Sequence, residues 1–418
     1  MTGPLQKPGR KNPLAKTSLA LLPPQARSVP SLGLLAGAAL GRFALQRCGD
    51  CGTFLYPVRD VCPECLGQSL SFEDAPTGGQ ILSETLIEVT ADTYFRGRPP
   101  VRQGLVLADC GARMVVLLHR ACAAGGRVRL SLKIDRAGQA AVFAHPETGR
   151  EAGMEDDPAW QELTAQPKFR RVLITDGRSP VALPLAQMLL AAGADQVNIG
   201  ISERWKPDAG LAALEAITGV TLFDLDLRDE RSVQDLATAL GGKTDILVNT
   251  AHHYRPGSLF QPGEVLRAKD ALDISALGLM RLAHSFGPAM ASRGGDGVRS
   301  AVAWVNVLSI WAASGRPASA GYAAAQAAAL SVAQSLRAEL AQGGVRVMNV
   351  FTGALDDPWF EGLPPPKVAP QAVAKGILGA LSDGIEETFI GVEAEDYRAR
   401  LSRNPKEIER LMWRGEGQ

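Results

Sequence analysis

The sequence predicts a multidomain protein in which a small metal-binding ribbon and a short-stranded β-barrel precede a doubly wound α/β domain. Three observations predict this class. Four of the six cysteines form two CxxC pairs between residues 48 and 65. Short apolar strands separated by glycine-containing turns follow over residues 80–144, and strands alternate with helical segments from residue 171 onward. A chain of 418 residues is also too long for one ordinary core.

The composition narrows the classes of function. Lys+Arg and Asp+Glu are both 44, so we expect no broad basic surface for nucleic acid. The apolar run over residues 32–40 is too short to span a bilayer, and we expect no membrane segment. Cysteine usage of this kind is typical of a reduced compartment, which predicts a cytoplasmic protein. Residues 1–40 are expected to form a mobile arm, rich in Pro, Lys and Arg, and a short helix.

The two CxxC pairs over residues 41–75 indicate a structural zinc ribbon. Cys48 and Cys51 form the first pair, and Cys62 and Cys65 form the second, with ten residues between the pairs. Four thiolates complete a tetrahedral zinc site and leave no open position for a substrate. Two disulfides or four buried free cysteines are the alternatives, and the ribbon spacing favours zinc over both.

The next segments are predicted from their strand spacing and polarity. Residues 76–147 contain five strand-like runs with glycine turns between them and no helical period, which indicates a small barrel. Residues 148–169 are polar and carry prolines, so we expect a linker there.

The run GRFALQRCGDCGTFLYPVRDVCPEC at residues 41–65 resembles the zinc-ribbon/OB-fold proteins that accompany acyl-CoA thiolases. The resemblance covers residues 41–147. It implies a helix over residues 31–41, an OB-fold for the barrel, a thiolase-like partner and a CoA thioester as a ligand of the assembly. OB barrels often bind nucleic acid, but this one lacks a dense basic and aromatic face, so we expect no nucleic acid.

Residues 170–418 are predicted to form a Rossmann-like domain with a doubly wound parallel sheet. The order of landmarks over residues 170–395 resembles the short-chain dehydrogenase/reductase family. The family's turn Thr-Gly-x-x-x-Gly-x-Gly would begin at Thr175, and its glycine amides cradle a diphosphate at a helix N-terminus. This chain keeps Gly177 but has Asp176, Pro180 and Ala182 at the three motif glycines. A carboxylate and a missing amide donor there argue against ordinary NAD(P) binding.

Three other positions bear on a cofactor. Asp226, in DLDLRD, matches the family position that meets adenine, and Asn249 stands where the family has Asn-Asn-Ala-Gly. Arg178 is either a compensating charge for a bound dinucleotide or a solvated loop residue.

The catalytic positions of the family are half retained. Ser309 matches the serine that hydrogen-bonds the substrate, and Tyr322, thirteen residues later, matches the proton donor. The family's lysine, whose charge lowers the pKa of the tyrosine, is replaced by Gln326. Its helical asparagine is replaced by Asp273. We therefore expect this domain not to transfer hydride. The alternative is an unusual reductase in which Gln326 and Arg178 substitute.

Together the two resemblances predict an accessory subunit of a thiolase-type complex that handles 3-oxoacyl-CoA in a β-oxidation-like pathway. The alternative is an active NAD(P)-dependent 3-hydroxyacyl-CoA dehydrogenase fused to a docking domain. The alanine-rich segment 321–342 and the helix around residues 271–290 correspond to the family's dimer interface. This correspondence implies a dimer with itself or with an active homologue.

Overall fold

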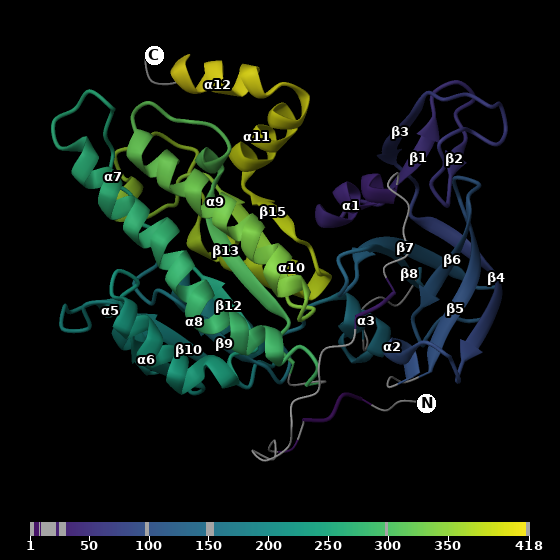
Figure 1. Ribbon diagram of the computed structural model, residues 1–418, viewed down its shortest axis with the longest axis horizontal. Helices are drawn as coiled ribbons and strands as arrows, with labels where there is room; N and C mark the ends of the chain where they lie inside the picture. The colour runs from purple at the N-terminus through teal and green to yellow at the C-terminus, as the bar shows by residue number, and fades with distance from the viewer. Residues whose placement is uncertain are drawn as a thin grey trace. The chain divides into compact units, whose positions relative to one another are not determined.

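The computed structural model describes residues 4–7, 9, 22–24, 31–96, 100–147, 154–296 and 300–414. Most of the predicted N-terminal arm lies outside these residues. The chain divides into two compact units (Figure 1). Of the described residues, the first contains 4–7, 22–24, 31–96, 100–147, 154–166 and 381–386, and the second contains 9, 167–296, 300–380 and 387–414.

The first unit begins with α1 (Leu32–Ala39) and a three-stranded antiparallel sheet in the order β2-β1-β3. The central strand β1 (Ala44–Cys48) pairs with β2 (Phe54–Leu55) and β3 (Leu70–Asp74). Because β1 ends at Cys48, the sheet fixes the start of the first CxxC pair.

The predicted small barrel is confirmed. Five strands close in the order β4-β5-β6-β8-β7, and closure removes the free strand edges that an open sheet would expose. Only β6 and β8 pair in parallel. The strands are β4 (Gly78–Ile87), β5 (Val101–Ala108), β6 (Arg113–Leu118), β7 (Arg127–Ile134) and β8 (Ala140–Pro146).

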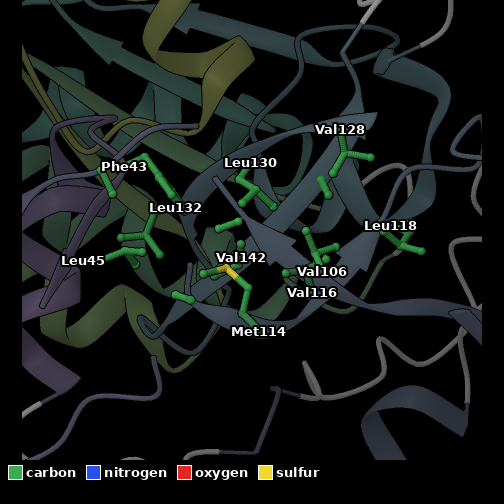
Figure 2. Packing of buried hydrophobic residues seen from close by; sticks show 14 of the residues in the cluster. Phe43, Leu45, Val106, Met114, Val116, Leu118, Val128, Leu130, Leu132 and Val142 are labelled. Atoms are coloured by element: carbon green, nitrogen blue, oxygen red, sulfur yellow. The ribbon is translucent and has the colours of Figure 1, made fainter. Parts of the chain in front are cut away.

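The ribbon and the barrel share one hydrophobic core. Alternate side chains of the strands point inward, among them Met114, Val116 and Leu130, and all three are at most 2% exposed. Phe43 and Leu45, from the start of the ribbon, pack into the same cluster (Figure 2). Burial of this apolar surface is the main stabilising contribution to the unit.

The segment that the sequence marks as a linker contains a short helix. It holds the 3-10 turn Met154–Asp156 and α3 (Pro158–Leu163). Asp157 caps α3 by accepting hydrogen bonds from two backbone amides of the helix. Trp160 and Leu163 of α3 are buried against Phe143 of the barrel, so part of this segment belongs to the first unit. A further short helix, α2 (Thr93–Arg96), precedes β5.

The second unit contains the predicted doubly wound sheet, which is confirmed. Seven strands pair in parallel in the order β11-β10-β9-β12-β13-β14-β15. Their apolar side chains are buried, as is usual when helices cover both faces of a parallel sheet. The strands are β9 (Arg171–Ile174), β10 (Gln196–Ile201), β11 (Val220–Asp224), β12 (Ile246–Asn249), β13 (Ala303–Ser309), β14 (Arg346–Thr352) and β15 (Glu387–Ile390).

Helices connect these strands, and α8 packs between α6 and α9. The strand order reverses between β9 and β12, which opens a crevice at the carboxyl ends of the strands. Among the described residues, none of the helices has the length and apolar character needed to cross a bilayer. The helices are α4 (Ala182–Ala191), α5 (Ala209–Glu215), α6 (Glu230–Leu240), α7 (Glu264–Leu272), α8 (Gly278–Ser292), α9 (Ala320–Ala341), α10 (Pro370–Asp383), α11 (Val392–Arg403) and α12 (Pro405–Arg414).

Candidate functional site

The structure brings the four predicted zinc ligands together. The sulfur atoms of Cys48, Cys51, Cys62 and Cys65 all lie within 4.8 Å of one another. Two of the sulfur pairs, Cys48 with Cys65 and Cys51 with Cys62, are 3.6 Å apart. A tetrahedron with Zn–S bonds of about 2.3 Å has edges of about 3.8 Å, so the sulfur atoms fit a zinc ion.

The turns that follow Cys48 and Cys62 are alike. Gly52 donates its amide to the carbonyl of Cys48, and Leu66 donates to the carbonyl of Cys62, both at 2.9 Å. Both donors have left-handed backbone, with φ of 76° for Gly52 and 61° for Leu66. Only glycine adopts this conformation without cost, so the ribbon holds Leu66 in it. With all four sulfurs as ligands, the ion would have a structural role.

The second candidate site is a cavity of about 440 Å³ at the carboxyl ends of β9, β10, β11 and β12. This is the crevice where open α/β sheets usually bind ligands. The turn after β9, the loops after the next three strands and the loop after β14 all contribute side chains to it.

Asp176 opens the turn after β9. Its Oδ1 atom accepts a hydrogen bond from the amide of Arg178 at 2.9 Å. Burial raises the pKa of Asp176, although the hydrogen bond and the nearby positive groups oppose the shift. Close packing favours glycine at position 177, because a Cβ atom on Gly177 would lie 2.9 Å from Ile199 of β10. A bound anion would therefore meet a carboxylate at this turn. The one glycine of the turn allows it to pack closely against the sheet.

Arg178 is neither a free positive charge nor a solvated loop residue. Its guanidinium donates to the carbonyls of Ser202, Glu203 and Lys206, at 3.0, 2.8 and 2.7 Å. It also lies 3.4 Å from the carboxylate of Asp208. The side chain thus links the turn after β9 to the loop after β10, and its donors are engaged within the protein.

The other two predicted cofactor positions also have protein partners. Asp226 lines the cavity but forms a two-point ion pair with Arg228, with N–O distances of 3.1 and 2.9 Å. Burial opposes ionisation, but the hydrogen bonds from Arg228 prevail and lower the pKa of Asp226. Asn249 accepts a hydrogen bond from the Thr175 hydroxyl at 2.8 Å. It therefore ties the end of β12 to the end of β9.

Gln326 fills the predicted lysine position on α9 and is 1% exposed. Its side-chain oxygen accepts from the amide of Ser309 at 2.9 Å, and its nitrogen donates to the hydroxyl of Ser275 at 3.3 Å. The amide group therefore fastens the end of β13 to the helix segment around Ser275. The Ser309 hydroxyl accepts a hydrogen bond from the amide of Trp311 at 3.2 Å.

Asp273 does not face Gln326. It forms an ion pair with Arg281 at 2.8 Å and remains partly exposed. Ser275 is the polar residue of this segment that contacts Gln326, and sequence reasoning did not find it. The two residues lie in the π-helical turn Asp273–Leu277, which changes the direction of the side chains relative to a regular helix. No sequence pattern marks that turn.

Tyr322 lies in an aromatic cluster at the start of α9. Its ring centre is 5.2 Å from that of Tyr254, 5.9 Å from that of Trp311 and 6.3 Å from those of Phe360 and His252. Tyr254 and Phe360 stack at 4.2 Å. The open space beside Tyr322 measures only about 10 Å³, which is roughly the space one water needs.

The surroundings of Tyr322 raise the pKa of its hydroxyl. Burial raises the pKa of the Tyr322 hydroxyl, and the nearby Tyr254 and Asp357 side chains act in the same direction. A general base or acid in this position works best with a pKa near the operating pH. The pKa of this phenol therefore lies further from neutral pH than that of a free tyrosine.

Comparison with protein families finds two matches. The short chain dehydrogenase profile matches residues 170–364. The profile of the rubredoxin-like zinc ribbon domain of ChsH2 matches residues 35–71. The two matches fall on the two parts of the chain that contain the cavity and the cysteine cluster.

Two curated relatives are dehydrogenases. The chain is 30% identical over 242 residues to 1-deoxy-11-beta-hydroxypentalenate dehydrogenase of Streptomyces exfoliatus, which covers 56% of this chain and 86% of that protein. It is 29% identical over 204 residues to cis-4-hydroxycyclohexanecarboxylate dehydrogenase of Sinomonas cyclohexanicum, covering 47% of this chain and 77% of that protein. Both alignments leave a large part of this chain unmatched.

A solved structure of similar fold is a short chain dehydrogenase from Burkholderia cenocepacia J2315 in complex with NADP. It is 25% identical, has a TM-score of 0.52, and covers 59% of this chain and 98% of that chain.

Proposed function

Because this chain belongs to the short-chain dehydrogenase family and carries a ChsH2-type zinc ribbon ahead of that domain, we propose that it is an accessory subunit of a thiolase-type acyl-CoA complex. In this proposal the dehydrogenase fold serves assembly and does not transfer hydride. The complex would act on 3-oxoacyl-CoA intermediates of a β-oxidation-like pathway in the cytoplasm.

The hydrogen bonds of Gln326 are the main observation behind the proposal that this domain does not transfer hydride. A dehydrogenase of this family needs a cation beside the tyrosine, and Gln326 brings no charge. Both polar atoms of its side chain already have partners, Ser309 and Ser275, and the side chain is 1% exposed, so it offers a ribose hydroxyl no charged and accessible group. The raised pKa of Tyr322 agrees with the loss of the cation.

The turn after β9 supports the same proposal, because it does not suit a diphosphate. Asp176 directs a carboxylate into the cavity, and Pro180 lacks an amide hydrogen. Arg178 is held by three carbonyl groups and cannot neutralise a phosphate without leaving them. Two features that suit a diphosphate, a free amide and the absence of a negative charge, are thus changed at one turn, and the arginine beside them is engaged elsewhere.

The first unit supports the docking role. Its strand order β4-β5-β6-β8-β7, with β6 and β8 parallel, is compatible with an OB-fold. We propose that this barrel and the zinc ribbon bind a thiolase-like partner, and that the barrel lies near the CoA thioester. The fusion would raise the effective concentration of one component near the other.

The second unit offers a surface for a dimer, with itself or with an active homologue. Leu277 and Met280 on the α8 side are about half exposed, and α9 adds exposed alanines such as Ala324 and Ala327. Small residues allow a partner helix to approach closely.

The alternative function is an active NAD(P)-dependent 3-hydroxyacyl-CoA dehydrogenase with a docking domain. It is favoured by the named activities of the two relatives and by the NADP in the similar structure. The retention of Ser309 and Tyr322 also favours it.

Cofactor titration separates the two functions. We expect no saturable quenching of tryptophan fluorescence by NADH or NADPH in the micromolar range, because Trp359 lines the cavity and would report binding. Saturable binding together with reduction of acetoacetyl-CoA would establish the dehydrogenase. In a second experiment the tagged chain is purified from its native cells, and recovery of a thiolase is expected. A stable chain recovered without a thiolase would refute the docking role.

A further inference from the structure

Asp357 is a buried carboxylate with an unused oxygen. It lies in the loop after β14, lines the cavity and is 9% exposed. Its Oδ1 atom accepts from the amide of Phe360 at 3.0 Å and so caps the 3-10 turn Pro358–Phe360. Its Oδ2 atom has no hydrogen-bond partner among the described residues. A buried polar atom without a partner is costly, and in a residue that lines a cavity it points to a ligand that donates to it.

The charges around the cavity favour a cation. Lys206 pairs with Glu203, and Arg228 pairs with Asp226. Arg178 is engaged by loop carbonyls and Asp208, as described above. Five carboxylates and four cations line the cavity, namely Asp176, Glu203, Asp226, Asp270 and Asp357 against Arg178, Lys206, Arg228 and Arg255.

After these pairings three carboxylates remain without an ion pair among the described residues, namely those of Asp176, Asp270 and Asp357. They face one guanidinium, that of Arg255, which lies 3.9 Å from the ring centre of Trp359. His253 adds no positive charge at neutral pH, because burial and then the charge of Arg255 lower its pKa. The cavity therefore repels anions and attracts cations.

Apolar side chains form the rest of the wall. Leu225, Leu227 and Ile274 lie near the ends of β11 and α7, and Trp359 lies on the loop beside Asp357. A volume of about 440 Å³ is within the range of small-molecule sites, roughly 300–1,000 Å³. An apolar wall with a few convergent carboxylates suits an apolar molecule that carries one positive charge.

We propose that this cavity binds a small organic cation, whose protonated amine donates to Asp357 and whose apolar frame contacts Leu225, Leu227 and Trp359. The inference rests on the proposed function in one respect, since it takes the crevice to be free of a dinucleotide. A small organic cation differs from a dinucleotide in charge, so a set of similar ligands with different charges tests the proposal.

Three indole compounds provide the series. Tryptamine, tryptophol and indole-3-acetate share one ring system and carry a cationic, a neutral and an anionic side chain. Calorimetric titration of the full-length, zinc-loaded protein at neutral pH should give a Kd for tryptamine at least tenfold lower than that for tryptophol. Indole-3-acetate should not bind measurably. Equal affinities for tryptamine and tryptophol would overturn the proposal.

Two variants test whether the carboxylate of Asp357 is the charge that binds the cation. Asp357→Asn removes it but keeps an oxygen that can cap the turn, since asparagine caps as well as aspartate. We expect this variant to bind tryptamine at least tenfold more weakly and tryptophol unchanged. The matched control is Asp356→Asn, which changes an exposed neighbour outside the cavity and should bind as the parent does. Melting curves of both variants verify that they fold. Unchanged tryptamine affinity in a folded Asp357→Asn protein would refute the inference.

A parallel titration with NADH shows whether a failed tryptamine experiment overturns this inference alone or the proposed function as well. If NADH binds and tryptamine does not, both the proposed function and the inference fail. If neither NADH nor tryptamine binds, the inference alone fails.

Discussion

The zinc ribbon and the crevice of the α/β unit differ in how they combine fold and chemistry. In the ribbon, the residues that would hold the ligand are also the residues that hold the segment together, and all four cysteines converge. In the α/β unit, the core consists of buried apolar side chains of the strands and helices, most of which do not line the crevice. Gln326, Arg178 and Asn249 have acquired or kept hydrogen bonds within the protein. We expect such a fold to keep its shape whether or not the crevice keeps its chemistry.

The largest expected effect comes from breaking the ribbon. Cys62→Ser should abolish zinc binding, because the hydroxyl is a poor substitute for a thiolate in a four-sulfur site. Structural zinc in small domains binds with apparent free energies of about 10–16 kcal/mol, and without it we expect residues 41–75 to unfold. Elemental analysis should give one zinc per chain in the parent and almost none in the variant.

Cys110→Ser is the matched control for this experiment, because Cys110 is outside the cysteine cluster. It should keep its full zinc content. A Cys62→Ser protein with full zinc would show that the ribbon does not depend on its ligands.

The next effect concerns the core of the α/β unit. Trp304, near the start of β13, is fully buried, and its indole nitrogen donates to Asn306 at 3.0 Å. Trp304→Ala should lower the free energy of unfolding of this unit by about 3–5 kcal/mol, since it leaves a large cavity. Chemical denaturation followed by circular dichroism measures the change. Trp205→Ala, at a 76% exposed position, should change it by less than about 0.5 kcal/mol. Similar losses in both variants would contradict the assignment of the core.

Prediction from the sequence succeeded where the pattern is repetitive or the spacing is strict. The CxxC pairs fixed the zinc ligands, and alternating apolar strands predicted the barrel and the parallel sheet. Each of these depends on many residues or on backbone geometry that the spacing itself determines.

The arrangement of the crevice could not be predicted in the same way. Arg178 reaches carbonyls of a loop 24 to 28 residues away, and backbone carbonyls leave no trace in a sequence. Ser275 contacts Gln326 because of a π-helical turn. The packing of Tyr254 and Phe360 around Tyr322 joins three distant segments, and single aromatic residues carry no signal of this contact.

A smaller effect, dependent on pH, is expected at Asp176. Its pKa is raised in the folded protein, chiefly by burial, so the folded state binds the proton more tightly than the unfolded chain. Stability is therefore full below the unfolded pKa of about 3.9 and falls as the pH rises through the folded pKa. Asp176→Asn keeps an acceptor for the Arg178 amide and removes the charge. It should be more stable than the parent at pH 7, by about 1.4 kcal/mol for each unit of pKa shift.

Denaturation curves at several pH values measure the difference between the two proteins, which should shrink towards pH 4. Asp356→Asn is the control, because that carboxylate is exposed, and its curves should follow those of the parent. Parallel pH profiles for Asp176→Asn and the parent would show that the carboxylate at 176 is solvated and not a barrier to an anion.

The smallest effect on stability is expected at Tyr322, and it tests the comparison most directly. Tyr322→Phe removes a hydroxyl in an aromatic environment and should change the free energy of unfolding by less than about 1 kcal/mol. If the crevice has lost its chemistry, reduction of acetoacetyl-CoA with NADH is absent in the parent and stays absent in the variant. Tyr397→Phe, which removes a hydroxyl bonded to Ser314, serves as the control. A parent turnover that falls about 100-fold or more in Tyr322→Phe and not in Tyr397→Phe would show proton transfer by this phenol. The crevice would then be catalytic despite Gln326. It would differ from the ribbon only in the kind of ligand that it binds.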